Sequence, residues 1–206
     1  IAQGLEQAYP NASFLFVGAK GKMEMEKVPQ AGYAIKGLWI SGLSRKISFD
    51  LLIFPFKLIW SLWQSLFILM RFRPDLVIGT GGYASAPLLK MAQWLGFPTL
   101  IQEQNSFPGI TNRILSRYVN KICVAYDKMN RFFKEDKLLF TGNPIRENIS
   151  NFSSSKETGY DFFNLDNNQC TVLVIGGSLG ARTINLAISN SINFFKKNKI
   201  NLIWQT

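Results

Sequence analysis

The sequence predicts an α/β protein with parallel strands, and a pattern that occurs twice carries the prediction. Asp75 to Gly79 is a short apolar run that stops at a glycine cluster, as a buried parallel strand does. Ala84 to Leu95 then has apolar residues at helical spacing. The same order of strand, glycine loop and helix returns between Thr171 and Phe195. A chain of 206 residues has room for one large domain or for one and a half smaller ones.

The elements before this central unit alternate in the same way. Ser13 to Val17 is expected to form a strand that ends at Gly18, and Met23 to Val28 a short helix before a proline. Tyr33 to Ile40 is expected to be extended and to end in a turn at Ser41 to Leu43. The first part of the chain therefore adds strands to the same kind of sheet.

The segment from Ile47 to Met70 is expected to be a long helix with an unusual distribution of polar residues. Its polar residues fall on one narrow stripe of the helix: Asp50, Lys57, Ser61 and Gln64. Three alternatives stay open: a helix that spans a membrane, a core helix packed on the sheet, and a helix half in the core and half in the membrane interface.

We favour the interface because bulky aromatic residues flanked by cations suit it. The residues expected to touch lipid are Phe49, Ile53, Phe56, Trp60 and Trp63. The cations available for anionic headgroups are Arg45, Lys46, Lys57 and Arg71.

The glycines of the central unit predict a site for an anion. Gly79 to Gly82 would let a ligand approach the backbone, and the following helix presents free N–H groups with a partial positive charge. The next apolar run, Pro98 to Ile101, leads into Glu103 and Asn105. Open α/β sheets bind their ligands at the carboxyl ends of the strands, so both residues are expected beside the glycine loop.

Two other interpretations use the same residues. The glycine loop can be a tight turn without a ligand. Alternatively, Gly79, Gly81 and Ala84 fit the pattern G-x-G-x-x-A, with Glu103 at the distance expected of a dinucleotide-binding unit. In that case the carboxylate would bind ribose hydroxyls.

The rest of the chain completes one unit and begins another. Thr111 to Tyr118 is expected to be a helix, and Lys121 to Val124 and Leu138 to Phe140 strands. The Asn-Pro step after the last strand turns the chain and brings Arg146 to the sheet edge, where its guanidinium could meet a diphosphate.

The segment from Asn151 to Asn168 is rich in Ser, Asn and Asp and is expected to be a linker. With the second glycine loop, Gly176 to Gly180, this predicts two Rossmann-like domains, the second only begun. The expected division is residues 1–150, a linker at 151–168 and the start of a second domain at 169–206. Ile1 to Tyr9 has the pattern of a helix end and Ile200 to Thr206 that of a strand, so we expect a fragment of a longer protein.

Charge and cysteine content narrow the function classes. The formal net charge of +10, with a pI near 9.7, favours an anionic partner such as nucleic acid, acidic lipid headgroups or a phosphorylated substrate. Cys123 and Cys170 lie in strand-like runs without metal spacing, so buried free thiols are expected. The sequence contains no histidine, which excludes a Ser-His or Cys-His catalytic pair from it.

The sequence resembles the MurG family in five ordered stretches. They are Ile40 to Leu43, Gly81 to Tyr83, Glu103 to Asn105, Gly142 to Arg146 and Gly176 to Arg182. The resemblance covers nearly the whole chain, and the five stretches together are far more specific than each one alone.

The resemblance implies a GT-B glycosyltransferase with two Rossmann-like domains, no metal and no cofactor. Members of this family transfer N-acetylglucosamine (GlcNAc) from UDP-GlcNAc to the undecaprenyl-linked acceptor lipid I, giving lipid II for peptidoglycan. The implied location is peripheral, at the cytoplasmic face of the bacterial inner membrane. The implied partners are UDP-GlcNAc, lipid I and an anionic membrane surface, without nucleic acid.

The resemblance also assigns residues. Gly81, Gly82 and Tyr83 would face the acceptor diphosphate. The donor side would be formed by Asn105, Arg146, Gly177, Ser178 and Gly180. The family's first glycine loop would precede Ile1 and most of its nucleotide pocket would follow Thr206, so this chain is expected to be inactive alone. Leu179 also stands where many members carry a glutamine.

The chemistry requires a base for the acceptor hydroxyl and positive electrostatics for the departing UDP. Glu103 is the only acidic residue in the strand-end motifs that could act as this base, although the absent loop could supply it instead. Glu103 would otherwise bind substrate or support the loop. Two alternatives to a complete transferase remain: a non-catalytic, membrane-recruiting half of a split glycosyltransferase, and an NAD-type dinucleotide-binding module.

Overall fold

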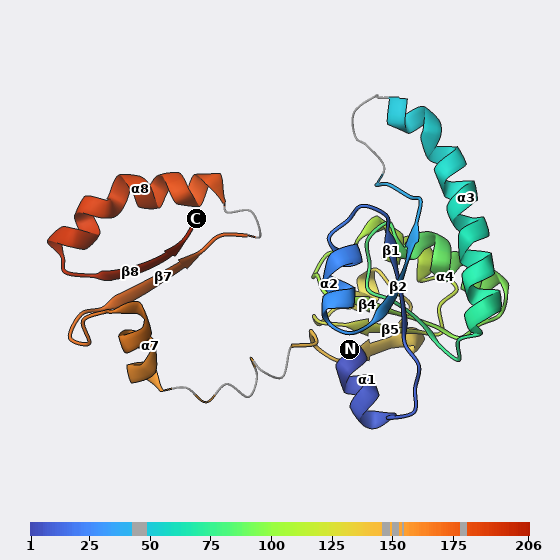
Figure 1. Cartoon of the computed structure of the whole chain (residues 1–206), viewed down its shortest axis with the longest axis horizontal. Coiled ribbons are helices and arrows are strands. Elements are labelled where there is room, and N and C mark those ends of the chain that lie inside the picture. Colours follow the sequence, from blue (N-terminus) through green and yellow to red (C-terminus); the bar gives the residue numbers. More distant parts are fainter. Residues whose placement is uncertain (43–48, 146–148, 150–152, 154, 178–180) are drawn as a thin grey trace. The chain divides into compact units, whose positions relative to one another are not determined.

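In the computed structural model the chain forms two units, Ile1–Pro144 and Ile145–Thr206 (Figure 1). It describes the chain except residues 43–48, 146–148, 150–152, 154 and 178–180, and it leaves out the side chains of residues 49–52. Helices alternate with parallel strands in both units, so the predicted α/β class is confirmed.

The first unit begins with a two-stranded part and continues with a larger sheet. The elements of the first part are α1 (Ala2–Ala8), β1 (Leu15–Ala19), α2 (Glu24–Gln30), β2 (Ala34–Leu38) and the long α3 (Phe49–Phe72). The larger part contains β3 (Val77–Gly79), α4 (Ser85–Trp94), β4 (Thr99–Glu103), α5 (Ile110–Leu115), β5 (Lys121–Val124), η1 (Met129–Arg131), η2 (Glu135–Lys137) and β6 (Leu138–Phe140).

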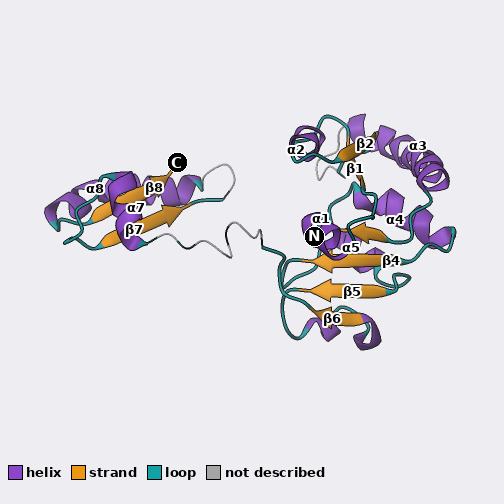
Figure 2. Cartoon of the chain, turned by 60° about the horizontal axis from the view of Figure 1, so that its bottom comes forward, coloured by secondary structure: helices purple, strands orange, loops and turns teal. Residues whose placement is uncertain are grey.

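All neighbouring strands of the first unit pair in parallel. The larger sheet has the order β3-β4-β5-β6, and β1 pairs with β2 in a sheet of its own. The arrows of β4, β5 and β6 point the same way in Figure 2. Because parallel strands end at one edge, the loops after β3, β4 and β6 meet there, as the sequence predicts.

The core of the larger sheet fixes the position of α4. Leu89 of α4 and Ile101 of β4 are fully buried, and they belong to one apolar cluster with Val77. A Cβ added to Gly79 would lie 2.8 Å from Leu89 Cδ2. The missing side chain at Gly79 therefore lets α4 pack closely on the sheet, with its first residue beside the strand ends.

The polar stripe of α3 faces the protein rather than solvent. Ser61 and Ser65 are fully buried, and each hydroxyl donates to a carbonyl of the same helix, at 2.8 and 2.7 Å. Gln64 Oε1 accepts from the Trp39 N–H at 2.9 Å, just beyond β2. The inward side of the helix thus combines these polar groups with apolar side chains such as Leu58, Ile68 and Leu69, while further apolar side chains stay on the outside.

The second unit contains α7 (Lys156–Phe163), β7 (Thr171–Ile175), α8 (Arg182–Lys197) and β8 (Asn201–Gln205). β7 and β8 pair in parallel on either side of α8 in the sequence. This is the strand–loop–helix pattern that the second glycine loop predicts.

Two details of the second unit differ from expectation. The segment expected to be a linker contains α7, which is capped by Ser155: its Oγ accepts from the Thr158 N–H at 3.3 Å. The helix is short and contains a glycine, so its periodicity is weak. Cys170 is exposed, not buried, because it precedes β7; Cys123, within β5, is half-buried. The functional division into acceptor domain, linker and donor domain stays a prediction.

Candidate functional site

The site in the first unit is built on the glycine loop between β3 and α4. Gly81 and Gly82 have φ angles of +92° and +75°, where other residues would be strained. Ser85, the first residue of α4, donates from Oγ to the carbonyls of Gly81 at 3.0 Å and Gly82 at 2.9 Å. The side chain of the first residue of α4 thereby holds the glycine loop in place.

The same loop leaves hydrogen-bond donors free for a ligand. Within the described part of the chain, the backbone N–H groups of Gly82 and Tyr83 donate no hydrogen bond. They lie next to the start of α4, a helix of ten residues. Free N–H groups together with the positive end of a helix can bind an anion such as phosphate.

Glu103, at the end of β4, is the most highly coordinated side chain of the site. It is 1% exposed. Its Oε1 accepts from the backbone N–H and the side-chain amide of Asn105, at 2.9 and 3.0 Å. Its Oε2 accepts from the Gly109 N–H at 3.1 Å and from Asn112 Nδ2 at 2.9 Å. Four donors therefore satisfy the carboxylate and tie both ends of the following loop to the strand.

This coordination bears on both roles suggested for Glu103. A general base needs a lone pair directed at the acceptor hydroxyl, and a ribose-binding carboxylate needs two exposed oxygens. Neither is offered by a carboxylate that is buried and bonded to four protein donors. The geometry instead favours a carboxylate that positions Asn105.

Asn112 belongs to this site, although the sequence did not reveal it. Its side chain is 2% exposed and donates from Nδ2 to Glu103 and to the Gln102 carbonyl, the latter at 3.4 Å. A Cβ added to Gly81 would lie 3.6 Å from the same nitrogen. Asn112 thus bonds to Glu103 and lies next to the glycine loop. It lies within α5, where an asparagine has no sequence pattern of its own.

The buried Oδ1 of Asn112 has no hydrogen-bond partner among the described residues. The amide orientation is fixed, because Nδ2 already serves two acceptors. The Oδ1 of Asn112, close to the glycine loop, can therefore accept one more hydrogen bond.

Amide side chains connect the loops that follow β3, β4 and β6. Gln104 Nε2 donates to the Thr80 carbonyl at 3.1 Å, and Asn143 Nδ2 to the Gln104 carbonyl at 3.3 Å. Gln102 Nε2 donates to the Gly142 carbonyl at 3.2 Å. Three stretches far apart in the sequence are thus held at one edge of the sheet.

The end of β2 reaches the same loop. A Cβ added to Gly42 would lie 3.2 Å from the ring of Tyr83. Tyr83 also packs against the buried cluster of Ala19, Leu38 and Ile40. Lys57 of α3 donates to Ser41 Oγ at 3.3 Å, with its ammonium 5.9 Å from the centre of the Trp39 ring.

The predicted donor residues are only partly described. Asn105 is exposed at the sheet edge of the first unit. Gly177 is exposed in the second unit. Arg146, Ser178 and Gly180 lie outside the described residues.

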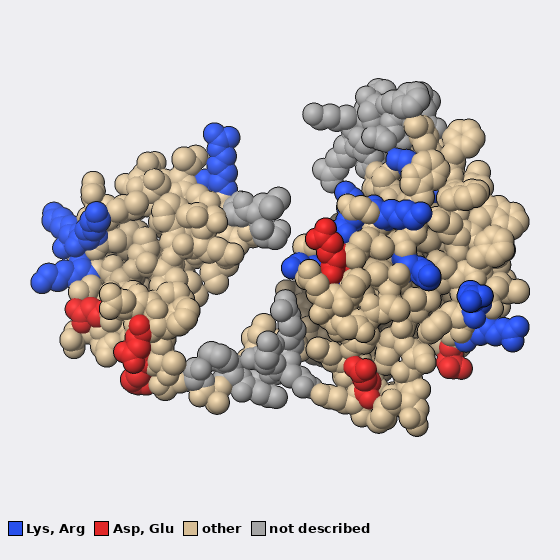
Figure 3. Space-filling view, viewed as in Figure 1, with Lys and Arg blue, Asp and Glu red and all other residues tan. Residues whose placement is uncertain are grey.

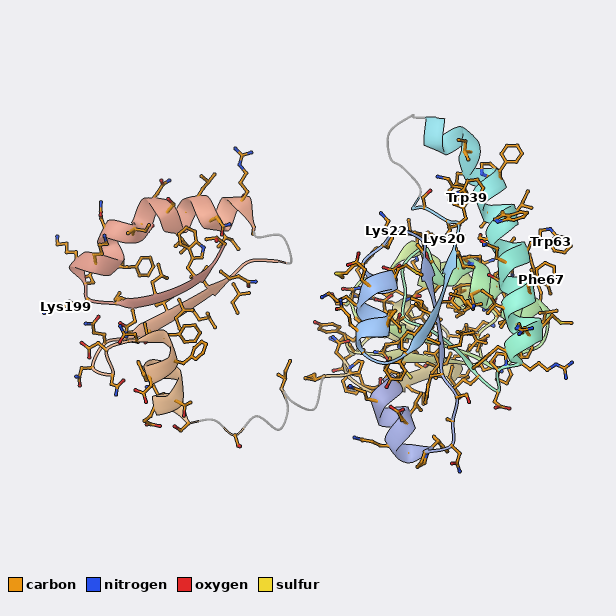
Figure 4. The ribbon with its side chains drawn as sticks, viewed as in Figure 1. Lys20, Lys22, Trp39, Trp63, Phe67 and Lys199 are labelled. Carbon is orange, nitrogen blue, oxygen red and sulfur yellow. The ribbon has the colours of Figure 1, made fainter. Side chains whose placement is uncertain are left out.

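The outer face of α3 is apolar over most of its length. Phe56 and Phe67 are 70% and 67% exposed, and Figure 4 shows Trp63 and Phe67 pointing away from the sheet. Four more large apolar side chains of α3 are more than half exposed: Ile59, Trp60, Trp63 and Met70. An open apolar groove of about 230 Å³ runs between α3 and α4, lined by Ile59, Leu62, Trp63, Leu66, Met91 and Trp94.

The structure of α3 bears on the alternatives predicted for this helix. Residues Ile53–Phe72 are long and apolar enough to cross a membrane, but one side of the helix packs on α4 and β2. Ile53 is half-buried, and the side chain of Phe49 lies outside the described residues. Lys57, which was expected to reach headgroups, donates from its ammonium to Ser41 Oγ, and its contact with headgroups stays a prediction.

Comparison with known proteins links this site to a family. The model of the glycosyltransferase family 28 N-terminal domain matches residues 1–124. A Flavobacterium psychrophilum protein is 53% identical over 205 residues, 100% of this chain and 56% of that protein. It is named UDP-N-acetylglucosamine--N-acetylmuramyl-(pentapeptide) pyrophosphoryl-undecaprenol N-acetylglucosamine transferase. A Cytophaga hutchinsonii protein of the same name is 50% identical, with coverage of 100% and 56%. The chain thus spans a little over half the length of these relatives.

The fold agrees with this similarity. The crystal structure of Acinetobacter baumannii MurG matches with a TM-score of 0.66 and 22% identity, over 99% of this chain and 59% of that one. At this identity the match shows the fold alone, and the predicted GT-B type is confirmed.

The four hydrogen bonds of Glu103 lead to a prediction for stability. In Glu103→Gln the new amide group faces backbone and side-chain donors instead of accepting from them. We expect a loss of about 2–3 kcal/mol in the free energy of unfolding, measured by urea denaturation. Glu26→Gln, at an exposed carboxylate of α2, is the matched control and should change the free energy of unfolding by less than about 0.5 kcal/mol. Equal stability of both variants would contradict the four-donor arrangement.

Proposed function

This chain belongs to glycosyltransferase family 28, and from that premise we propose that the full-length protein transfers GlcNAc from UDP-GlcNAc to lipid I, giving lipid II. Relatives with this named activity match the whole chain, as the resemblance to MurG predicts. The observation that supports the proposal is the sheet edge of the first unit. There, a glycine loop with free backbone N–H groups lies beside the buried, hydrogen-bonded carboxylate of Glu103.

In this proposal the glycine loop binds the acceptor. The free N–H groups of Gly82 and Tyr83, at the positive end of α4, would receive the pyrophosphoryl oxygens of lipid I. Gly81 contributes by its lack of a side chain, which keeps the backbone accessible at a φ angle of +92°.

Glu103 is assigned a positioning role. It fixes the loop that carries Asn105, whose exposed side chain keeps its own oxygen available for the donor sugar. An inverting transfer still needs a base for the acceptor hydroxyl. In this proposal, that base is supplied by a group other than Glu103.

The donor side is proposed from the family resemblance. Arg146 would provide a guanidinium for the UDP diphosphate, because a departing nucleotide needs positive charge. Ser178, with Gly177 and Gly180, would provide the second phosphate-binding glycine loop.

We further propose that α3 attaches the protein to the cytoplasmic face of the inner membrane without crossing it. A lipid-linked acceptor keeps its tail in the bilayer, so the acceptor loop must approach the surface. The outward side of α3 offers exposed aromatic rings, and exposed Arg71 at the last turn offers charge for anionic headgroups. The inward polar stripe explains how the helix can contact lipid and remain part of the domain.

Ligand selectivity tests the transferase proposal against the dinucleotide alternative. UDP-GlcNAc should raise the thermal unfolding midpoint of the full-length protein, because a ligand bound to the folded state stabilises it. NAD should leave the midpoint unchanged, because Glu103 is not free to bind ribose. The same samples are assayed for GlcNAc transfer to lipid I. Stabilisation by NAD, or the absence of transfer, would contradict the proposal.

Membrane attachment is tested by replacing exposed aromatic residues of α3. Phe56→Ser with Trp60→Ser should release the protein from anionic liposomes in a flotation assay, while circular dichroism stays unchanged, because both side chains are exposed. Phe162→Ser, at an 81% exposed ring of α7, is the control and should still float. High salt should weaken the wild-type attachment, because it screens the headgroups. A wild-type protein that never floats, or a double variant that unfolds, would refute the interfacial contact.

A further inference from the structure

We propose that the carboxyl ends of β1 and β2 form a subsite for the peptide of the acceptor, with Lys20 and Lys22 binding its carboxylates and Trp39 forming an apolar wall. This inference rests on the proposed function, since the relatives' name includes a pentapeptide on the muramyl group. Figure 4 shows the three side chains at the same end of the β1–β2 pair.

Lys20 is held in place more firmly than an ordinary surface lysine. Its backbone N–H donates to the Leu38 carbonyl at 2.9 Å and so extends the pairing of β1 with β2. Its aliphatic chain lies across β2 at Gly37, where an added Cβ would be 2.7 Å from Lys20 Cγ. The absence of a side chain at Gly37 therefore provides the space for the aliphatic stem of Lys20.

Lys22 lies close to Lys20 across a tight turn. Gly21, between them, has a φ angle of +70°, and the Lys22 N–H donates to the Ala19 carbonyl at 3.3 Å. Both lysines are exposed, and neither ammonium pairs with a carboxylate within the described part of the chain. Figure 3 shows lysine and arginine side chains gathered on this part of the first unit.

Two carboxylates of α2 lie near these lysines. Glu24 is half-buried, and its Oε1 accepts from the Ala19 N–H at 3.0 Å, so the carboxylate is bonded to the end of β1. Glu26 is exposed two residues further along the helix. The lysines at the strand ends are therefore not neutralised by an ion pair with either group, and an anionic ligand would be attracted to them.

Trp39 supplies an apolar surface next to the lysines. It follows β2 directly, and its side chain is 44% exposed. The bond from its N–H to Gln64 fixes the backbone at this point. A partly exposed indole on a fixed backbone can pack against the aliphatic parts of a peptide at little entropic cost.

The position of this surface decides which part of the acceptor it fits. The end of β2 lies near the acceptor loop, because Tyr83 packs against the cluster that contains Leu38 and Ile40, the neighbours of Trp39 in the sequence. A ligand on that loop would therefore extend toward Trp39. In the proposed function the pyrophosphate lies on the loop and the hydrocarbon chain stays in the bilayer that α3 contacts. The remaining substituent of the acceptor is the peptide. A peptide attached through its amino end keeps a free carboxyl end, which is complementary to the two lysines.

The experiment compares two acceptors on the full-length protein. One carries the pentapeptide with free carboxyl groups, and the other carries the same peptide with these groups amidated. For the wild type, the KM for the free-carboxyl acceptor should be lower, and this preference should fall as salt is raised. Lys20→Gln with Lys22→Gln should raise that KM by roughly two- to fivefold per lysine, because exposed charge pairs are individually weak. The kcat, and the KM for the amidated acceptor, should stay unchanged.

Control variants separate the subsite from a general charge effect. Lys27→Gln removes the same charge from the far turn of α2, where the ammonium contacts Gln30, and should leave both KM values unchanged. Trp39→Ala should raise the KM for both acceptors, and Trp39→Phe should restore most of the affinity. The amidated acceptor also reports on folding, because a misfolded double variant would lose activity with it.

Two results overturn the inference while leaving the proposed function intact. One is an equal wild-type KM for both acceptors. The other is a double variant with the same preference as Lys27→Gln, which would mean that the two lysines do not bind the carboxylates of the peptide. Absence of transfer to either acceptor would instead overturn the proposed function itself.

Discussion

The acceptor edge of the first unit depends on one buried carboxylate. Glu103 is a charge at the end of a buried strand, and such a charge is tolerated only when donors surround it. Four donors do so, and they come from the loop after β4 and from α5. The desolvation of the carboxylate is thereby offset, and the same bonds fix Asn105. Because Asn112 also lies next to Gly81, one side chain stands between the carboxylate and the anion-binding loop.

The sequence predicted most of the fold, because alternating apolar runs and glycine stops carry strong local signals. It also placed the glycine loop and Glu103 at one edge correctly, since parallel strands end together. It could not reveal Asn112, whose role depends on contacts with residues distant in sequence. It could not distinguish a base from a support at Glu103, because only the hydrogen-bond partners decide between them. The helix α7 was missed for a simpler reason: its eight residues show little periodicity.

The helix α3 shows how a polar stripe can be misread. A narrow polar stripe on an apolar helix suggests that the stripe faces water. Here the serines form bonds inside the helix and Gln64 binds the residue after β2, so the stripe lies on the packed side, together with apolar residues such as Leu69. The exposed rings on the opposite side then need an apolar partner, and this joins the membrane proposal to the acceptor loop.

The central claim is that Glu103 positions the acceptor edge of a GlcNAc transferase and does not accept the proton. The pH dependence of kcat in the full-length protein, compared between wild type and Glu103→Gln, tests it most directly. A positioning residue predicts a lower kcat with an unchanged profile, because the base that titrates is still present. Loss of the acidic limb of the profile in Glu103→Gln would contradict the account and make Glu103 the base.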